Sequence, residues 1–179
     1  MTTPDSATCR LASPEVLDDL LLYRLSRLHA TAGSVVVRYC EGQFGITRRE
    51  WRIVALLASR GPMGSSELAA HAHLDRPRTS KAVTALAGKK LVSRTPRAGD
   101  ARQVQLALTS AGAALHGALF PLVSQINRDV LAVLQPEEAS ALSGMLERLQ
   151  QRADVMSTHD NLPLADRRRG GSARQLDRR

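Results

Sequence analysis

Aromatic side chains and cysteines are scarce in this chain. Phe, Trp and Tyr together make up 3% of its 179 residues, and the only two cysteines are Cys9 and Cys40. A leucine- and alanine-rich chain with so few aromatic residues favours packed helices over a sandwich of sheets. Two cysteines this far apart exclude a disulfide framework.

Several functional signatures are also missing from the sequence. It contains no run of about 18 apolar residues, which excludes a membrane span, and its first 14 residues do not resemble a secretory signal. It has no glycine-rich phosphate loop, nucleophile elbow or pair of catalytic carboxylates. His71 and His73 alternate along a predicted helix, so they point apart and do not suggest a metal site. We therefore expect a cytoplasmic protein without catalytic residues, metal or cofactor.

Positive charge is the abundant property. The 25 Lys and Arg residues outnumber the 17 Asp and Glu residues, giving a net charge of +8. Such a surplus indicates an anionic partner, although about a third of it could lie in the C-terminal tail. The hydrophobic content of 43% suffices for a core in one or two small domains. We expect residues 1–13 and the arginine-rich residues 157–179 to be disordered tails.

Two short helices with a tight break between them are predicted in the middle of the chain. The first covers residues 65–72, with Ser65 as its N-cap, and the second begins at Asp75, another cap residue, with Pro77 in its first turn. The break falls at His73 and Leu74. This spacing is typical of a helix-turn-helix motif.

The second helix has two distinct faces. Thr79, Ala82, Val83 and Leu86 recur at helical spacing and would seat it on a core. The opposite face is small, polar and basic, as a helix that enters the major groove of double-stranded DNA must be. The candidate DNA-binding residues on this helix are Arg76, Pro77, Arg78, Ser80, Lys81 and Thr84.

A β-hairpin is predicted after this helix. Residues 91–95 and 104–108 read as strands, and the loop between them contains Pro, Gly and several charged residues. Arg97 and Arg102 could reach phosphates or the minor groove, with Asp100 orienting Arg102. A helix-turn-helix followed by such a hairpin is a winged helix, which we place at residues 47–109.

Three motifs in order make a family resemblance specific. They are Leu86-Ala87-Gly88-Lys89-Lys90-Leu91-Val92-Ser93-Arg94, then Asp100-Ala101-Arg102, then Leu108-Thr109-Ser110-Ala111-Gly112. Over roughly residues 15–152 the chain resembles the MarR family of bacterial transcription regulators, which places Asp-x-Arg in the wing and Leu-Thr-x-x-Gly at the start of a long helix. One departure is Lys90, where the family usually has a glycine that ends the helix in a left-handed turn.

Four further helices are predicted besides the two of the helix-turn-helix, one of them inside the winged helix and three outside it. The first is expected to run from residue 14 to 41, with Leu22, Leu25, His29, Ala32 and Val36 as one buried stripe. A second, at 48–59, would be capped by Thr47 and face inward with Trp51, Val54, Ala55 and Ala58. A long helix over 110–134 and a final one complete the chain. The segments 14–41 and 110–152 carry more apolar surface than one small domain can cover, so we expect them to form a helical dimerisation layer.

The resemblance implies how such a dimer works. It implies a homodimeric repressor on a near-palindromic operator, released by a small anionic effector that is frequently aromatic. His29 is either a hydrogen-bonded core residue or part of the effector pocket, and Trp51 with Arg24 or Arg38 could complete that pocket.

Two other functions stay open at this point. A basic winged helix could instead serve as a structural or assembly module that binds protein partners, or nucleic acid without sequence preference. As a variant of the repressor, Cys9 near the start of the first helix could sense oxidants.

Overall fold

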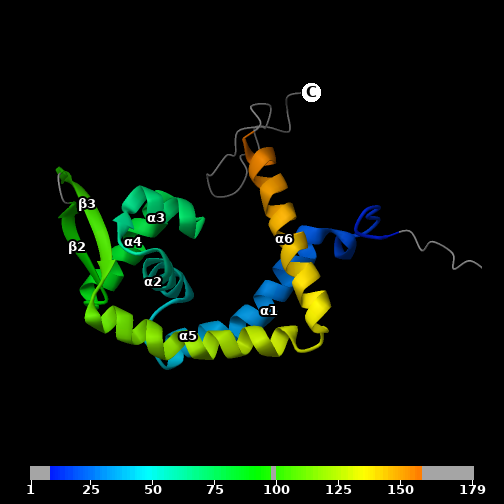
Figure 1. Ribbon diagram of the computed structural model, residues 1–179, viewed down its shortest axis with the longest axis horizontal. Helices are drawn as coiled ribbons and strands as arrows, with labels where there is room; N and C mark the ends of the chain where they lie inside the picture. Colours follow the sequence, from blue (N-terminus) through cyan, green and yellow to red (C-terminus); the bar gives the residue numbers. More distant parts are fainter. Residues whose placement is uncertain (1–8, 98–99, 159–179) are drawn as a thin grey trace, which may run out of the picture. The chain divides into compact units, whose positions relative to one another are not determined.

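The computed structural model describes residues 9–97 and 100–158, and the side chains of all of these except residues 97–103. The elements in chain order are the 3-10 turn η1 (Leu17–Asp19), α1 (Leu21–Gly42), α2 (Arg48–Arg60), β1 (Met63–Gly64), α3 (Ser65–Ala72), α4 (Arg76–Gly88), β2 (Val92–Arg97), β3 (Asp100–Leu108), α5 (Ser110–Leu131) and α6 (Pro136–Ser157). This order confirms the predicted fold class, mainly helical with a winged helix-turn-helix (Figure 1). The chain divides into two compact units, Met1–Val133 and Leu134–Arg179.

The core of the first unit lies where α2, α3, α4 and the sheet meet. Ile53, Leu68, Leu86 and Leu106, one from each of these elements, are fully buried. Thr47 caps α2 as predicted, because its side chain accepts a hydrogen bond from the backbone N–H of Glu50 at 3.2 Å. Trp51 and Val54 of α2 face inward as expected, whereas Ala58 is exposed because Leu57 completes the buried face instead.

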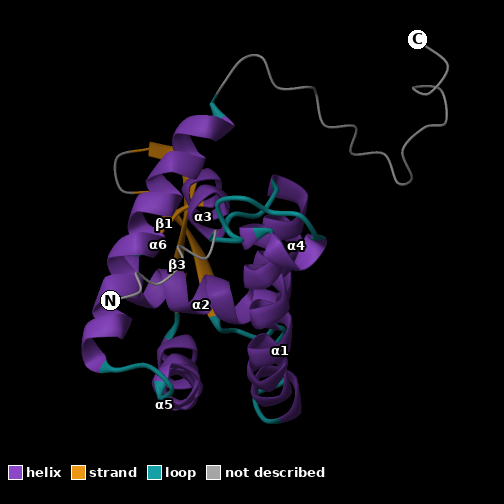
Figure 2. Ribbon diagram, turned by 90° about the vertical axis from the view of Figure 1, so that its right-hand side faces the viewer, coloured by secondary structure: helices purple, strands orange, loops and turns teal. Residues whose placement is uncertain are grey.

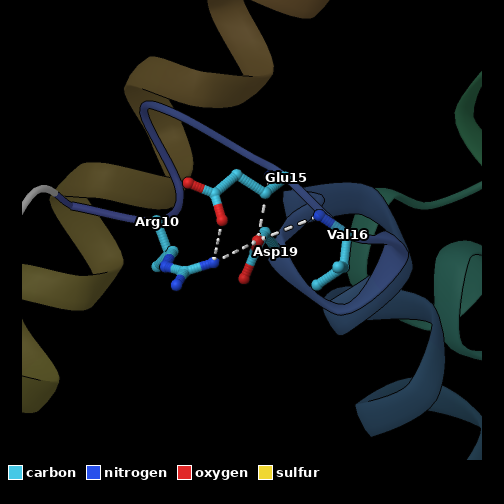
Figure 3. Close-up of polar contacts among 4 residues, drawn as sticks. All are labelled: Arg10, Glu15, Val16 and Asp19. Atoms are coloured by element: carbon cyan, nitrogen blue, oxygen red, sulfur yellow. Dashed lines mark hydrogen bonds and ion pairs between the residues drawn. The ribbon is translucent and has the colours of Figure 1, made fainter.

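The prediction of one continuous helix over residues 14–41 was wrong at its start. Leu20 has an extended backbone conformation, with ψ at 124°, and therefore separates η1 from α1. The Asp19 carboxylate accepts hydrogen bonds from the backbone N–H groups of Glu15 and Val16 at 3.0 and 3.1 Å, and Arg10 pairs with Glu15 at 2.7 Å (Figure 3). These backbone donors are the main reason why the pKa of Asp19 lies below its ordinary value.

The predicted buried stripe of α1 is uncovered over its first half in the single chain. Leu22 is 79% exposed and Leu25 is 37% exposed. Ala32 and Val36, further along the helix, are half-buried. Leu28, on the adjoining stripe, is 54% exposed. Contacts between α1 and α5 cover only part of this helix.

The helix-turn-helix forms where it was predicted. α3 ends at His73, whose φ of 49° is left-handed, and the N–H groups of His73 and Leu74 donate to the carbonyls of Ala70 and Ala69, both at 3.1 Å. This pair of bonds closes the end of the helix in a Schellman turn.

The predicted caps of these two helices have different outcomes. Asp75 caps α4, accepting a hydrogen bond from the backbone N–H of Arg78 at 2.8 Å. The prediction for Ser65 was wrong, because Gly64 has the extended N-cap conformation and Ser65 is already the first helical residue.

A third strand joins the predicted hairpin. β1 pairs antiparallel with β3, giving the sheet order β1-β3-β2 with Met63 opposite Leu106 and Val92 opposite Leu108. Figure 2 shows the strands next to α3. The sequence indicated only a break over residues 60–64, because a two-residue strand is too short to show alternation.

The end of α4 explains the departure at Lys90. Lys90 takes the left-handed conformation itself, with φ at 58°, and donates its N–H to Ala87 O at 2.9 Å. The N–H of Leu91 donates to Leu86 O, also at 2.9 Å, so this end is again a Schellman turn. The family's turn is therefore kept with lysine in the place of glycine.

The Leu-Thr-x-x-Gly motif connects the wing to α5. The Thr109 hydroxyl donates to Lys90 O at 2.7 Å and accepts from the N–H of Gly112 at 3.0 Å, while the Thr109 N–H donates to Leu91 O at 3.1 Å. A side chain at Gly112 would overlap the carbonyl oxygen of Leu91. The motif therefore holds the start of α5 against the end of α4.

α5 and α6 complete the chain. α5 ends at Leu131 and keeps Pro121 within the helix, so it is slightly shorter than the predicted 110–134. α6 begins with Pro136, and the Glu138 carboxylate accepts from the backbone N–H of Gln135 at 2.9 Å. Among the described helices, none is long and apolar enough to cross a membrane.

We expect Gly112→Ala to destabilise the protein by about 2 kcal/mol, because the added methyl group must displace the Leu91 backbone. Gly117→Ala is the matched control, since nothing lies near that glycine of α5 and alanine there should stabilise the helix by about 1 kcal/mol. Urea unfolding followed by circular dichroism, at one protein concentration, measures both. Equal effects of the two substitutions would contradict this account of the motif.

Candidate nucleic-acid interface and adjacent cavity

The two faces of α4 separate as the sequence predicted. Thr79, Ala82, Val83 and Leu86 are buried. The candidate DNA-binding residues of this helix are all exposed: Arg76, Pro77, Arg78, Ser80, Lys81 and Thr84. The Asp75 carboxylate, which caps the helix, also pairs with the Arg78 guanidinium at 3.2 Å. That contact limits the directions in which Arg78 can extend.

A hollow of about 280 Å³ lies beside this exposed face, between α3, α4 and the sheet. Its lining residues are Ser65, Ser66, Arg76, Thr79, Ser80, Val83, Arg94 and Val104. They include two guanidinium groups and several hydroxyls but no carboxylate, so the hollow offers hydrogen-bond donors to an anion. Arg94 donates to the Thr84 hydroxyl at 2.9 Å.

Arg94 was not among the candidate residues. It lies on β2 within the motif that carries the family resemblance, and its pairing with Leu106 places it at the middle of the strand. The signal that could have found it is an arginine on the strand that directly follows the recognition-helix candidate.

The wing is described through its backbone. β2 and β3 pair from Val92 opposite Leu108 to Arg97 opposite Asp100, with an irregularity between Pro96 and Arg97. Both strands are longer than predicted, and the connecting residues 98 and 99 lie outside the described part of the chain. The side chains of residues 97–103 also lie outside it, so the roles of Arg97, Asp100 and Arg102 stay predictions.

A second, larger cavity of about 620 Å³ lies within the first unit, between α1, α2 and α5. Apolar residues from all three helices form most of its wall, and the polar lining side chains are His29, Arg48, Arg52 and Asn127. Trp51 forms part of the wall as well. The structure therefore brings together two of the predicted pocket residues, His29 and Trp51.

The other two predicted pocket residues do not reach this cavity. Arg24 lines a separate hollow with Arg27 and Thr31, and Arg38 lines another with Tyr39. Their positions on α1 turn them away from α2 and α5, because a helix rotates by about 100° per residue. Neither arginine lines the cavity between α1, α2 and α5.

Arg48 and Arg52 of α2 take their place, and sequence reasoning missed both. Arg48 lies three residues before Trp51, and Arg52 lies directly after it. Together with Ala55 they follow the spacing i, i+3, i+4, i+7, which places all four on one face of the helix. The spacing of two arginines around the single tryptophan is the signal that could have found them.

Gly33 makes room for the Arg48 side chain. This glycine of α1 is buried, and a Cβ there would overlap Arg48 Nη1. The absence of a side chain at Gly33 thus lets a guanidinium lie against α1 at the edge of the cavity. An anion entering the cavity would find this donor already in place.

His29 faces a positively charged neighbourhood. The pKa of His29 is lowered, first by the charge of Arg48, then by partial burial and by the charge of Arg52. No carboxylate lines this cavity among the described residues. A bound anion would therefore meet two arginines and a histidine that it would help to protonate.

A row of stacked rings lies behind Trp51. Its ring centroid is 5.5 Å from that of His116, which in turn is 5.1 Å from that of Phe120. The two ring planes of each pair are inclined to each other by 18° and 26°, respectively. These contacts hold the indole of Trp51 in the cavity wall and join α2 to α5.

The cysteines take no part in either site. Cys9 is exposed and Cys40 is buried, and burial raises the pKa of the Cys40 thiol. A thiol with a raised pKa is a poor nucleophile at neutral pH. Within residues 9–97 and 100–158, no three His, Cys, Asp or Glu residues gather as a metal site requires.

Comparison with known proteins agrees with this geometry. The model of the MarR family matches residues 46–104. The transcriptional regulator FarR of Neisseria gonorrhoeae is 32% identical over 116 residues, which cover 65% of this chain and 80% of FarR. The homoprotocatechuate degradative operon repressor of Escherichia coli is 29% identical over 57% of this chain and 69% of the repressor.

Solved structures share the fold. The crystal structure of NadR in complex with 4-hydroxyphenylacetate matches with a TM-score of 0.65 and 27% identity, over 75% of this chain and 95% of NadR. Wild-type MarR from E. coli matches with a TM-score of 0.63 at 20% identity, over 75% of this chain and 98% of that protein.

We expect His29 to titrate below its ordinary pKa of 6.5, with Arg48→Ala moving the pKa back toward that value. Since the unfolded chain binds this proton more readily than the folded one, lowering the pH through this range favours unfolding. NMR titration of the histidine ring signals measures the pKa. Arg49→Ala, one residue away on α2 and outside the cavity lining, is the control. An unchanged His29 pKa in Arg48→Ala would show that the two side chains do not interact.

Proposed function

The chain belongs to the MarR family of transcription regulators, and from this premise we propose that it is a homodimeric repressor that a small aromatic acid releases from its operator. Two observations support the proposal. The exposed face of α4 carries only small, polar and basic side chains, and the cavity between α1, α2 and α5 combines an apolar wall with cationic groups. The exposed face of α4 is the observation that supports DNA binding.

On DNA, we assign α4 to the major groove. Arg76, Ser80 and Lys81 extend from its exposed face and can donate hydrogen bonds to base edges and phosphates, while Pro77 and Thr84 add little bulk. Arg78 is held by Asp75 and so favours a phosphate beside the helix start. Arg97 and Arg102 of the wing, with Asp100 as partner, are assigned to the minor groove or its phosphates.

The dimer is proposed to form through the two ends of the chain, residues 14–41 and 110–152. Leu20, just before α1, is 45% exposed and Leu22 in α1 is 79% exposed, and in α6, Met145, Leu146 and Leu149 are each more than 40% exposed. Apolar rows this extensive on helices are typical of surfaces that a second subunit covers. Two winged helices on one dimer would read the two halves of a near-palindromic operator.

The effector is proposed to bind in the cavity of about 620 Å³, a size suited to a small ring compound. Its carboxylate would meet Arg48, Arg52 and His29, and its ring would lie along Trp51 and the aliphatic wall. NadR binds 4-hydroxyphenylacetate, and a second relative is named as repressor of homoprotocatechuate degradation. Both names contain an arylacetate, in which one carbon joins the carboxylate to the aromatic ring.

The relatives are transcription regulators, which is not an enzymatic role. We infer that this chain likewise catalyses no reaction. Its place of action is then the bacterial cytoplasm, where the DNA lies.

Selection from a random pool of DNA duplexes tests the DNA-binding part. We expect a near-palindromic sequence bound at least about a thousandfold more tightly than random duplex at the same salt concentration. Arg76→Ala should weaken this binding by about 1–3 kcal/mol and relax the selected sequence at one position per half-site. Arg49→Ala is the control, because this exposed residue of α2 lies outside α4, the wing and the proposed dimer segments. A ratio near one for the wild type would instead indicate an assembly module without sequence preference.

Fluorescence titration tests the effector part, because Trp51 is the only tryptophan. We expect 4-hydroxyphenylacetate to change the Trp51 emission and to weaken binding to the selected duplex about tenfold, which requires about 1.4 kcal/mol of differential binding. The uncharged 4-hydroxyphenylethanol should do neither. Arg48→Ala should weaken binding of the acid at least about tenfold, and Arg49→Ala should leave it unchanged. Equal binding of the acid and the alcohol would contradict the carboxylate site.

A further inference from the structure

One side chain contacts both the cavity and the helix-turn-helix. Arg52 lines the cavity between α1, α2 and α5, and its Nη1 donates a hydrogen bond to the backbone carbonyl of Ala72 at 3.0 Å. Ala72 is the last residue of α3. We propose that Arg52 transmits occupancy of the cavity to the turn before α4, and this inference rests on the proposed function of the cavity as an effector site.

The carbonyl of Ala72 has few other possible partners. The Schellman bonds at this helix end use the carbonyls of Ala69 and Ala70, and His73 turns the chain into the left-handed region. The carbonyl at such a helix end has no partner within its own helix. Ala72 is fully buried, and its carbonyl is bonded to a guanidinium whose own side chain is exposed. A cation there also matches the negative end of the helix dipole.

The position of this helix end determines where α4 begins. Only His73 and Leu74 separate Ala72 from Asp75, the N-cap of α4. If the backbone of Ala72 moves, the two residues of the turn are too few to absorb the movement, and α4 moves as well. Two correctly spaced recognition helices are needed to bind both half-sites, so a small displacement lowers operator affinity.

A carboxylate in the cavity competes for the same guanidinium. Charge-assisted hydrogen bonds between a guanidinium and a carboxylate are stronger than those between a guanidinium and a neutral carbonyl, and they are often bidentate. The bound anion draws Arg52 toward the cavity, and the bond to Ala72 is lost. The end of α3 and the turn are then free to move, while Arg48 and His29 hold the ligand at its other side.

This inference separates binding from response. In Arg52→Ala, 4-hydroxyphenylacetate binds more weakly, through Arg48 and His29, so it is added at a concentration that saturates the Trp51 emission of the variant. The bond that the acid would break is already missing. Operator affinity without ligand should fall about fivefold or more, and adding the acid should weaken it less than about twofold further, against about tenfold in the wild type. Arg60→Ala is the matched control, because Arg60 also lies on α2 and contacts α3, at His71, without lining the cavity.

Hydrogen exchange gives a measurement that needs no ligand. In Arg52→Ala, the amides of His73 and Leu74 should exchange several-fold faster than in the wild type, because they lie next to the carbonyl that has lost its partner. Arg60→Ala should leave their exchange near the wild-type rate. Unchanged protection in Arg52→Ala would overturn the inference whether or not any ligand binds.

The two proposals fail in different ways. If the wild type binds its selected duplex equally well with and without 4-hydroxyphenylacetate, the effector part of the proposed function is wrong, and the exchange of His73 and Leu74 decides the role of Arg52. If the wild type responds to the acid and Arg52→Ala shows the same tenfold response, the effector site stands and the link through Arg52 is wrong.

Discussion

The backbone of Leu91 is the constraint on which the DNA-binding half of the structure depends. Its N–H closes the end of α4 on Leu86, and its carbonyl accepts the N–H of Thr109 at 3.1 Å. The wing strand β2 begins at the next residue, and α5 begins one residue after Thr109. The recognition helix α4, the wing strand β2 and the long helix α5 are therefore all positioned by the backbone of Leu91. Gly112 is required there because a Cβ would occupy the space of the Leu91 oxygen.

α2 connects this half to the cavity. Its buried Glu50 accepts hydrogen bonds from the backbone N–H of Thr47 and from Nζ of Lys89, at 2.7 and 2.8 Å. A buried carboxylate is tolerated only when such partners compensate for lost hydration, so the pair holds the start of α2 and the end of α4 together. On its other sides α2 presents Trp51 and Arg52 to the cavity. A ligand bound beside α2 is thus only one helix away from the DNA-binding surface.

The sequence alone determined the local features of this protein. The faces of α4, the caps at Thr47 and Asp75, the helix-turn-helix spacing and the hairpin all follow from residues close together in the chain. Helical periodicity and capping act over a few residues, so they can be read without knowing what packs on them. The family motifs also lie within short stretches, and the Leu-Thr-x-x-Gly motif has a local structural reason in the contacts of Thr109 and Gly112.

The tertiary structure decided what surrounds the cavity and which distant segments pair. Arg24 and Arg38 were plausible pocket residues on α1, but the rotation of that helix turns them away and brings Arg48 and Arg52 of α2 to the cavity instead. β1 exists only because β3 lies beside it, and Lys90 keeps a left-handed turn because its neighbours close the helix around it. The contact between Arg52 and Ala72 joins residues 20 positions apart. Such features depend on how helices pack against one another, and periodicity within one helix carries no information about its partner.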